Sequence, residues 1–201
     1  MRLYHGTRSG LSSQILELGL LPRVLTESDN KWDECPSRPD AVYLTSVYAP
    51  YFAAAACGSR EDSDDKWLIV EVETEKMCGL MCPDEDFLEQ SQRSSGSRPH
   101  GATMEQMTAF WRENCHRYSG AWKDSLNGLG TCSVISDVGV PPEAITGVFL
   151  FDNEAKENRE IVWACCDPTI TLMNYQICND KYRGLTQQVI ERAKRIGGSE
   201  S

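Results

Sequence analysis

Short runs of β-branched and aromatic residues recur along the sequence, and they restrict its possible folds more than any other feature. They read RLYHG at 2–6, AVYLT at 41–45, WLIVEVETE at 67–75, TCSVISDVGV at 131–140, TGVFLFD at 146–152 and EIVWAC at 160–165. Few of them are arranged as the buried parallel β-α-β units of α/β proteins. We therefore expect an α+β fold, with a split antiparallel β-sheet core and flanking helices.

Helical patterns lie between and after these runs. They are SSQILELG at 12–19, the alanine-rich YFAAAAC at 51–57, MEQMTAFWREN at 104–114 and RGLTQQVIERAKRI at 183–196. Residues 23–40 read as a polar loop, GAWKDSLNGLG (120–130) as another loop, and 85–103, which contains SQRSSGSRPHG, as a mobile segment. A chain of 201 residues suits one domain at 1–180, followed by a C-terminal helix and frayed tail at 181–201.

The net charge of −10 limits the partners that this chain attracts. Broad nonspecific binding to nucleic acid needs many contacts between Lys or Arg side chains and phosphates, which so acidic a protein disfavours. A local basic groove is still compatible with this charge, and the region 93–123 contains such a set: Arg93, Arg98, His100, Arg112, Arg117 and Lys123.

The nine cysteines do not form the pattern of a secreted disulfide framework. Their number is odd, no CxxC occurs, and no apolar signal segment follows Met1. No apolar run approaches the length of a membrane span. We expect free thiols in the reducing cytoplasm, no membrane contact and no metal; a zinc site from Cys78, Cys82, Cys115 and His116 is a weaker alternative.

Three short motifs follow one another in a recognisable order. His5-Gly6-Thr7 ends the first strand, Val-Tyr-Leu-Thr at 42–45 forms the second, and LIVEVE at 68–73 follows an alanine-rich helix. This order resembles the ADP-ribosyltransferase superfamily in its diphtheria-toxin-like (His-Tyr-Glu) branch, and the pattern is most similar to DarT-like bacterial toxins. The resemblance covers residues 2–75 well and 130–152 loosely.

The resemblance implies an NAD site with specific residues. His5 would bond the adenosine ribose, and the backbone of Gly6 would pair with the nicotinamide amide. Tyr43 would stack on nicotinamide as part of the catalytic set, with Tyr51, backed by Tyr48, as the second aromatic wall. The remaining contacts with the cofactor would come from Thr7 and Thr45 at the rim, and from Arg8 or Arg23 at the pyrophosphate. Each residue also has a structural reading: Thr45, for example, could cap the next helix.

The third motif departs from the family pattern. The family has a glutamate there, which holds the ribose 2′-hydroxyl, stabilises the transition state and helps to activate the acceptor. In this chain the slot falls at or beside Ser133. Three explanations stay open: Glu105, Glu143 or Glu160 supplies the acid; the slot is natively non-acidic; or Ser133 is an engineered substitution. The Glu71-x-Glu73 pair lies on a different element, and we expect it to form a solvated strand face.

The resemblance thus predicts an NAD-dependent mono-ADP-ribosyltransferase, a toxin or defence effector that modifies a macromolecule. Analogy slightly favours RNA or DNA over protein as the acceptor, whereas the acidic charge favours protein, and an antitoxin or regulatory partner is expected with a toxin. Three alternatives remain: a catalytically silent NAD-binding module, an RNA 2′-phosphotransferase-like enzyme and an unrelated α+β protein. The phosphotransferase ranks lower because Tyr4, not arginine, precedes His5.

Overall fold

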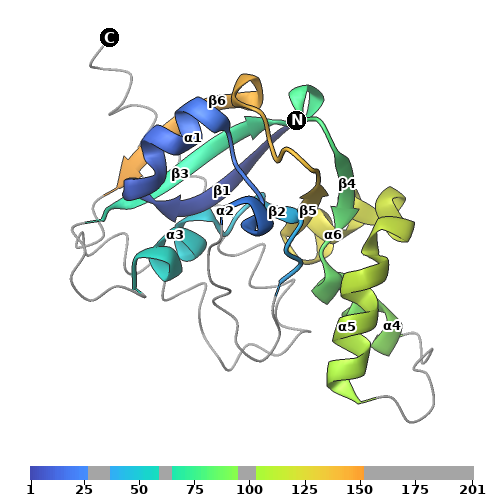
Figure 1. The fold of residues 1–201 in the computed structure, drawn as a ribbon. Helices are drawn as coiled ribbons and strands as arrows, with labels where there is room; N and C mark the ends of the chain where they lie inside the picture. Colours follow the sequence, from blue (N-terminus) through green and yellow to red (C-terminus); the bar gives the residue numbers. More distant parts are fainter. Residues whose placement is uncertain (27–36, 59–64, 95–102, 152–201) are drawn as a thin grey trace.

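The computed structural model describes residues 1–26, 37–58, 65–94 and 103–151, drawn in colour in Figure 1. The expected strand at 160–165, the C-terminal helix at 183–196 and Glu160 lie outside these residues. The parts of the expected polar loop at 27–36 and of the expected mobile segment at 95–102 also lie outside the described residues.

One six-stranded sheet organises the described residues, with the strand order β4-β5-β2-β1-β3-β6. Every neighbouring pair is antiparallel. The strands are β1 (Arg2–Arg8), β2 (Ala41–Thr45), β3 (Trp67–Glu73), β4 (Leu80–Pro83), β5 (Thr131–Ile135) and β6 (Ile145–Phe151). With the flanking helices described below, this sheet confirms the predicted α+β class.

The sheet is divided between β1 and β2. β1 pairs with β3 along its whole length, from Arg2↔Glu73 to Arg8↔Trp67. The register between β1 and β2, by contrast, contains the single pair Tyr4↔Thr45. The halves β4-β5-β2 and β1-β3-β6 are therefore joined by little backbone pairing, and polar groups near the join need other partners.

Helices flank the sheet, and the alanine-rich and amphipathic segments form as predicted. The α-helices are α1 (Ser12–Leu18), α2 (Arg23–Thr26), α3 (Ala49–Gly58), α4 (Glu85–Ser94), α5 (Met104–Asn114) and α6 (Trp122–Gly128); the 3-10 helices are η1 (Ser9–Leu11), η2 (Thr74–Lys76), η3 (Cys115–Ala121) and η4 (Pro142–Ala144). Within the described ranges, no helix has the length and apolar character needed to cross a membrane.

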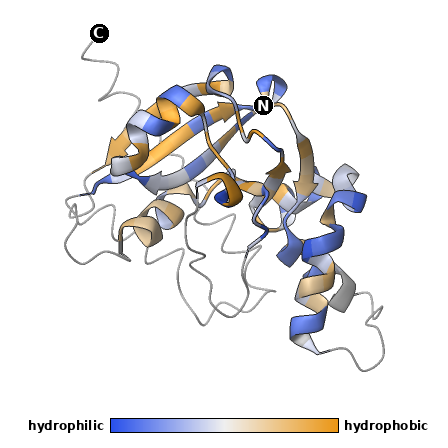
Figure 2. Cartoon of the chain, viewed as in Figure 1, coloured by the Kyte–Doolittle hydropathy of each residue, from blue (hydrophilic) through white to orange (hydrophobic). Residues whose placement is uncertain are grey.

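The four-residue helix α2 and two longer helices correct the sequence prediction, since 23–26 was expected to belong to a polar loop. Residues 85–94 form α4 rather than part of a mobile segment, and 122–128 form α6 rather than a loop. Each of the two longer helices is fixed by a buried leucine, Leu88 in α4 and Leu126 in α6. Tertiary packing therefore stabilises helices whose local sequence is polar, as the blue colouring of α4 in Figure 2 illustrates.

The two faces of the sheet are packed differently. One face carries a continuous apolar core from Leu3, Val42, Val70 and Val134, closed by Ile15 of α1. On the other face, a first cluster lies on the β1-β3-β6 half under α3, and a second joins β4 to α4 and α5. β2 runs between these two clusters, so polar side chains on this face of β2 are flanked by apolar packing on both sides.

The expectation of a solvated face at Glu71 is wrong. Glu71 is only 3% exposed. β6 pairs along β3, and Thr146 of β6 donates a hydrogen bond of 2.9 Å to the Glu71 carboxylate, while Arg2 lies 3.6 Å from it. A sixth strand at this edge thus covers a residue that the alternating pattern assigned to solvent.

Candidate functional site

The division of the sheet is bridged by a histidine side chain. His5 Nδ1 lies 2.9 Å from the backbone carbonyl oxygen of Tyr43. Because a carbonyl only accepts, Nδ1 carries the proton, and Nε2 of the neutral ring is left as an acceptor. Among the described residues, no group bonds Nε2. The first two sequence motifs therefore meet through the imidazole of His5 and the backbone of Tyr43, and Nε2 is an acceptor that no described residue uses.

The ring of His5 is held neutral by its surroundings. Burial lowers its pKa below the ordinary value, and the bond to the Tyr43 carbonyl offsets only part of this effect. A neutral imidazole at neutral pH can accept a hydrogen bond from a hydroxyl group, whereas an imidazolium cannot.

Gly6 is required by the packing of α3. A Cβ built on Gly6 would lie 1.9 Å from the backbone oxygen of Ala49 and 2.7 Å from the backbone nitrogen of Ala53. No side chain fits between β1 and a helix backbone at this distance. Gly6 thus has a structural reason to be glycine, independent of any ligand.

Tyr43 is anchored through its hydroxyl group. The hydroxyl donates to a carboxylate oxygen of Glu85, and it accepts from the backbone N–H of Arg38 at 2.9 Å. Burial, followed by the charges of Glu85 and Asp84, raises the pKa of Tyr43 well above its usual value. The phenol therefore stays protonated and continues to donate to Glu85.

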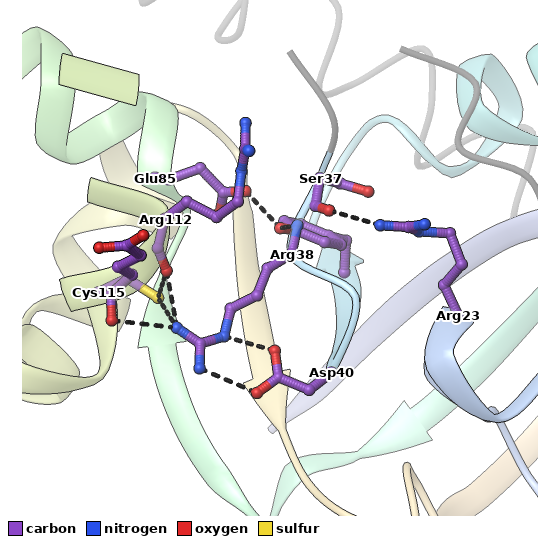
Figure 3. Close-up of polar contacts among 9 residues, drawn as sticks. Arg23, Ser37, Arg38, Asp40, Glu85, Arg112 and Cys115 are labelled. Carbon is purple, nitrogen blue, oxygen red and sulfur yellow. Dashed lines mark hydrogen bonds and ion pairs between the residues drawn. The ribbon is translucent and has the colours of Figure 1, made fainter. Parts of the chain in front are cut away.

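The side chain of Arg38 forms several hydrogen bonds near Tyr43 (Figure 3). It makes a paired contact with Asp40, at 2.6 Å from Nε and 2.9 Å from Nη2. Nη1 donates to the carbonyl of Arg112 at 2.7 Å, near the C-terminus of α5, and to Cys115 Sγ at 3.8 Å. A cation suits the negative end of a helix, and the Asp40 contact raises the pKa of Arg38 further. These contacts of Arg38 join the segment before β2 to the C-terminal end of α5.

Glu85 is buried at the start of α4 with an incomplete set of partners. It is 7% exposed, and no described residue forms a hydrogen bond with its second carboxylate oxygen, Oε2. The neighbouring Asp84 is equally hidden, and burial together with the charges of Glu85 and Asp86 raises its pKa to about 8. Ser125 of α6 fixes this turn, because its hydroxyl accepts from the Asp84 backbone at 3.0 Å and donates to the Thr131 carbonyl at 2.8 Å.

Ser133, in the slot of the expected acid, lies beside Tyr43. The β2–β5 register pairs Tyr43 with Ser133, and the β4–β5 register pairs Cys82 with Ser133, so these side chains share a face. Ser133 is fully buried, and its hydroxyl has no hydrogen-bond partner within the part of the chain that the structure describes. Buried polar atoms without partners are rare in native proteins, and two of them, from Glu85 and Ser133, adjoin the same tyrosine.

The remaining cofactor candidates are engaged in local structure. Thr45 is 1% exposed; its hydroxyl accepts from the backbones of Val47 and Tyr48 and donates to the Gly130 carbonyl at 2.7 Å, which shapes the turn into α3. Arg8 forms an ion pair with Asp65 at 3.1 Å. These contacts occupy the groups that a ligand would need at Thr45 and Arg8.

Four further residues were predicted from the sequence to contact the cofactor. Thr7 is buried in β1 after Gly6. Tyr51 is half-buried on α3, with its ring centroid 5.4 Å from that of Phe52, whereas Tyr48 is 5% exposed. Arg23 donates to the Ser37 carbonyl at 3.0 Å rather than standing free.

The acids proposed from sequence are not gathered at Tyr43. Glu105 is exposed in the first turn of α5, and Glu143 is exposed on η4. Glu160 lies outside the described residues. The acid that does contact Tyr43 is Glu85, which sequence reasoning missed because it belongs to the stretch interpreted as mobile. Arg38 and Asp40 were missed for a similar reason, since they were assigned to a featureless polar loop.

The cysteines in the described residues are free thiols; they are Cys57, Cys78, Cys82, Cys115 and Cys132. Cys82 and Cys115 are buried together, whereas Cys78 is exposed. In the part of the chain that the structure describes, no group of three or more metal-ligating side chains occurs.

Comparison with known proteins does not add a family to this geometry. No protein-family model matches the sequence, and no curated protein matches it either.

Proposed function

We propose that this chain binds NAD at the division between β1 and β2 and transfers its ADP-ribose to a macromolecule. The observation that carries the proposal is the bond between His5 Nδ1 and the Tyr43 carbonyl, since it brings the two motif strands together where the sheet opens. The proposed activity is the one that the resemblance to ADP-ribosyltransferases implies.

The described residues suit the groups that NAD presents. Nε2 of His5 is an acceptor for a ribose hydroxyl, and its neutral state is maintained by burial. Tyr43 is held with its hydroxyl fixed at both sides, so the orientation of its ring is set before a ligand arrives. Such preorganisation reduces the entropic cost of binding a flat ligand.

The acceptor in this proposal is a macromolecule, nucleic acid before protein. In the basic region 93–123, Arg117 and Lys123 are exposed and described. They are available to phosphates, although the net charge of −10 opposes long-range attraction of a polyanion.

A second candidate function is a silent NAD-binding module of the same fold. Ser133, a residue without a carboxylate in the slot of the family acid, favours it. The two candidates differ in one measurable step, because a silent module binds NAD without releasing nicotinamide.

The test uses NAD labelled in its adenylate part, with cell extract as the source of acceptors. We expect label to become attached to nucleic acid or protein with the unmodified chain, and to be lost in His5→Ala and in Tyr43→Ala. His116→Ala, at an exposed histidine, is the matched control and should label normally. Absence of any adduct, with NAD bound, would leave the silent module; absence of binding would reject both candidates.

A further inference from the structure

Tyr43 holds one buried acid, and the chain offers no acid at the β5 position where its proposed activity needs one. Among the described residues, the carboxylate that contacts the Tyr43 hydroxyl is that of Glu85. Glu85 follows β4 by two residues, and β4 is the strand beside β5, where Cys82 is paired with Ser133. The carboxylate that contacts Tyr43 therefore comes from the segment that follows the strand beside β5.

Two buried polar atoms beside Tyr43 lack hydrogen-bond partners among the described residues. Tyr43 donates to Oε1 of Glu85, while Oε2 is buried and has no partner among residues 1–26, 37–58, 65–94 and 103–151. The hydroxyl of Ser133, on the same face of the sheet as Tyr43, is also buried and has no partner in these ranges. Leaving a buried polar atom without a hydrogen-bond partner is costly. A bound polar group that donates to Oε2 would remove this cost.

We infer that Glu85 is the catalytic carboxylate of the proposed transfer, delivered from the N-terminal turn of α4 in place of an acid on β5, with Tyr43 fixing its orientation. The inference rests on the proposed function. In this arrangement Ser133 needs no acidic character of its own.

Glu85 assists the release of nicotinamide from the ribose. The bond between ribose C1′ and the nicotinamide nitrogen breaks, and its electron pair goes to that nitrogen, so nicotinamide leaves as a neutral molecule. A bond forms between C1′ and the nucleophilic atom of the acceptor, or of water, which loses a proton. Oε2 of Glu85 accepts a hydrogen bond from the ribose 2′-hydroxyl and offsets the positive charge that develops at C1′. The released proton passes to the carboxylate and then to solvent.

The test measures nicotinamide release from NAD, with water as the acceptor, so the natural acceptor need not be known. The variants are Glu85→Gln, which keeps the shape and can still accept from Tyr43, and Glu85→Asp, which keeps the charge but withdraws it. Glu89→Gln is the matched control, because Glu89 is a buried acid of the same helix that accepts from Thr108 at 3.1 Å. NAD binding is followed in parallel by calorimetry, and folding by thermal melting.

We expect Glu85→Gln to keep its affinity for NAD within about threefold and to slow nicotinamide release by about 100-fold or more. Glu85→Asp should fall between Glu85→Gln and the unmodified chain, and Glu89→Gln should release nicotinamide normally. If Glu85→Gln does not fold, the rates of nicotinamide release of Glu85→Asp and Glu89→Gln are compared. Slower release by Glu85→Asp supports the inference, and equal rates overturn it.

The outcomes that contradict the inference are separable from failure of the proposed function. Release by Glu85→Gln at the rate of the unmodified chain overturns the role of Glu85 and leaves the transferase intact. NAD binding without release in the unmodified chain overturns it in favour of the silent module. If the unmodified chain binds no NAD at all, the proposed function itself is rejected, and the inference with it.

Discussion

His5 Nδ1 donates to the backbone carbonyl oxygen of Tyr43 across 2.9 Å, where the register between β1 and β2 has ended. A side chain thus supplies a hydrogen bond that strand pairing supplies elsewhere in the sheet. The arrangement fixes the tautomer of His5 and, through the chain, the position of Tyr43.

Loss of this bond has a measurable effect on stability. His5→Ala removes the donor to the Tyr43 carbonyl, and we expect the free energy of unfolding to fall by about 1 kcal/mol. His5→Gln offers an amide donor and should recover part of the loss. Denaturant unfolding of both variants beside His116→Ala measures this difference; equal stability of all three would show that the bond does not contribute.

Gly6 should tolerate no larger residue. In Gly6→Ala the new methyl group meets the backbone of α3, and we expect a loss of about 3 kcal/mol, because a helix backbone cannot yield as a side chain does. Gly120→Ala is the matched control, since a Cβ there has no neighbour within 4 Å. Thermal melting compares the two variants, and a Gly6→Ala protein as stable as Gly120→Ala would disprove the close approach of α3.

The stabilising effect of Arg38 should depend on the geometry of its guanidinium group as well as on its charge. Arg38→Lys keeps the charge but loses the paired contact with Asp40 and the fork that also reaches the Arg112 carbonyl. We expect Arg38→Lys to recover less than half of a stability loss of about 2 kcal/mol caused by Arg38→Ala. Urea unfolding measures the stability of both variants. Full recovery in Arg38→Lys would show that the positive charge alone, without the paired hydrogen bonds, provides the stability.

Asp84 gives the protein a pH dependence of a definite sign. Its pKa in the folded protein is about 8, above the ordinary value of 3.8, so between these values the folded state binds more protons than the unfolded chain. The contribution of Asp84 to stability is therefore present at low pH and is lost as the pH rises through about 8. Asp84→Asn, whose side chain stays neutral, should make the fall in melting temperature from pH 5 to pH 8 less steep.

The matched control for this pH effect is Asp124→Asn, at an exposed acid of α6. It should leave the slope unchanged. A slope for Asp84→Asn equal to that of the unmodified chain would mean that Asp84 is ionised in the folded protein at neutral pH.

The sequence allowed the strands around His5 and Tyr43 to be predicted because their local signals agree with their tertiary environment. AVYLT combines β-branched and aromatic residues and forms β2 over the same residues. Gly19 ends α1 with φ of 83°, as expected for a helix-terminating glycine. Expected and observed structure match wherever one short segment determines its own conformation.

The acid beside Tyr43 could not be predicted, because long-range contacts determine it. The sequence does carry a local start signal, because the Asp84 side chain accepts from the Asp86 backbone at 3.0 Å and two acids lie in the first turn. The contact of Glu85 with Tyr43 has no such signal, since it depends on Leu88 packing with Met107 and Trp111 of α5. The contact of Arg38 with the end of α5 joins residues 74 apart in sequence. Pattern reasoning considers one segment at a time and therefore misses groups that tertiary packing brings together.

The most direct test of the account is whether NAD stabilises this protein through His5. We expect NAD at 100 times its dissociation constant to stabilise the unmodified chain by about 2.7 kcal/mol, visible as a rise in melting temperature, and to have no effect on His5→Ala. A melting temperature of the unmodified chain that stays constant up to millimolar NAD would contradict the account.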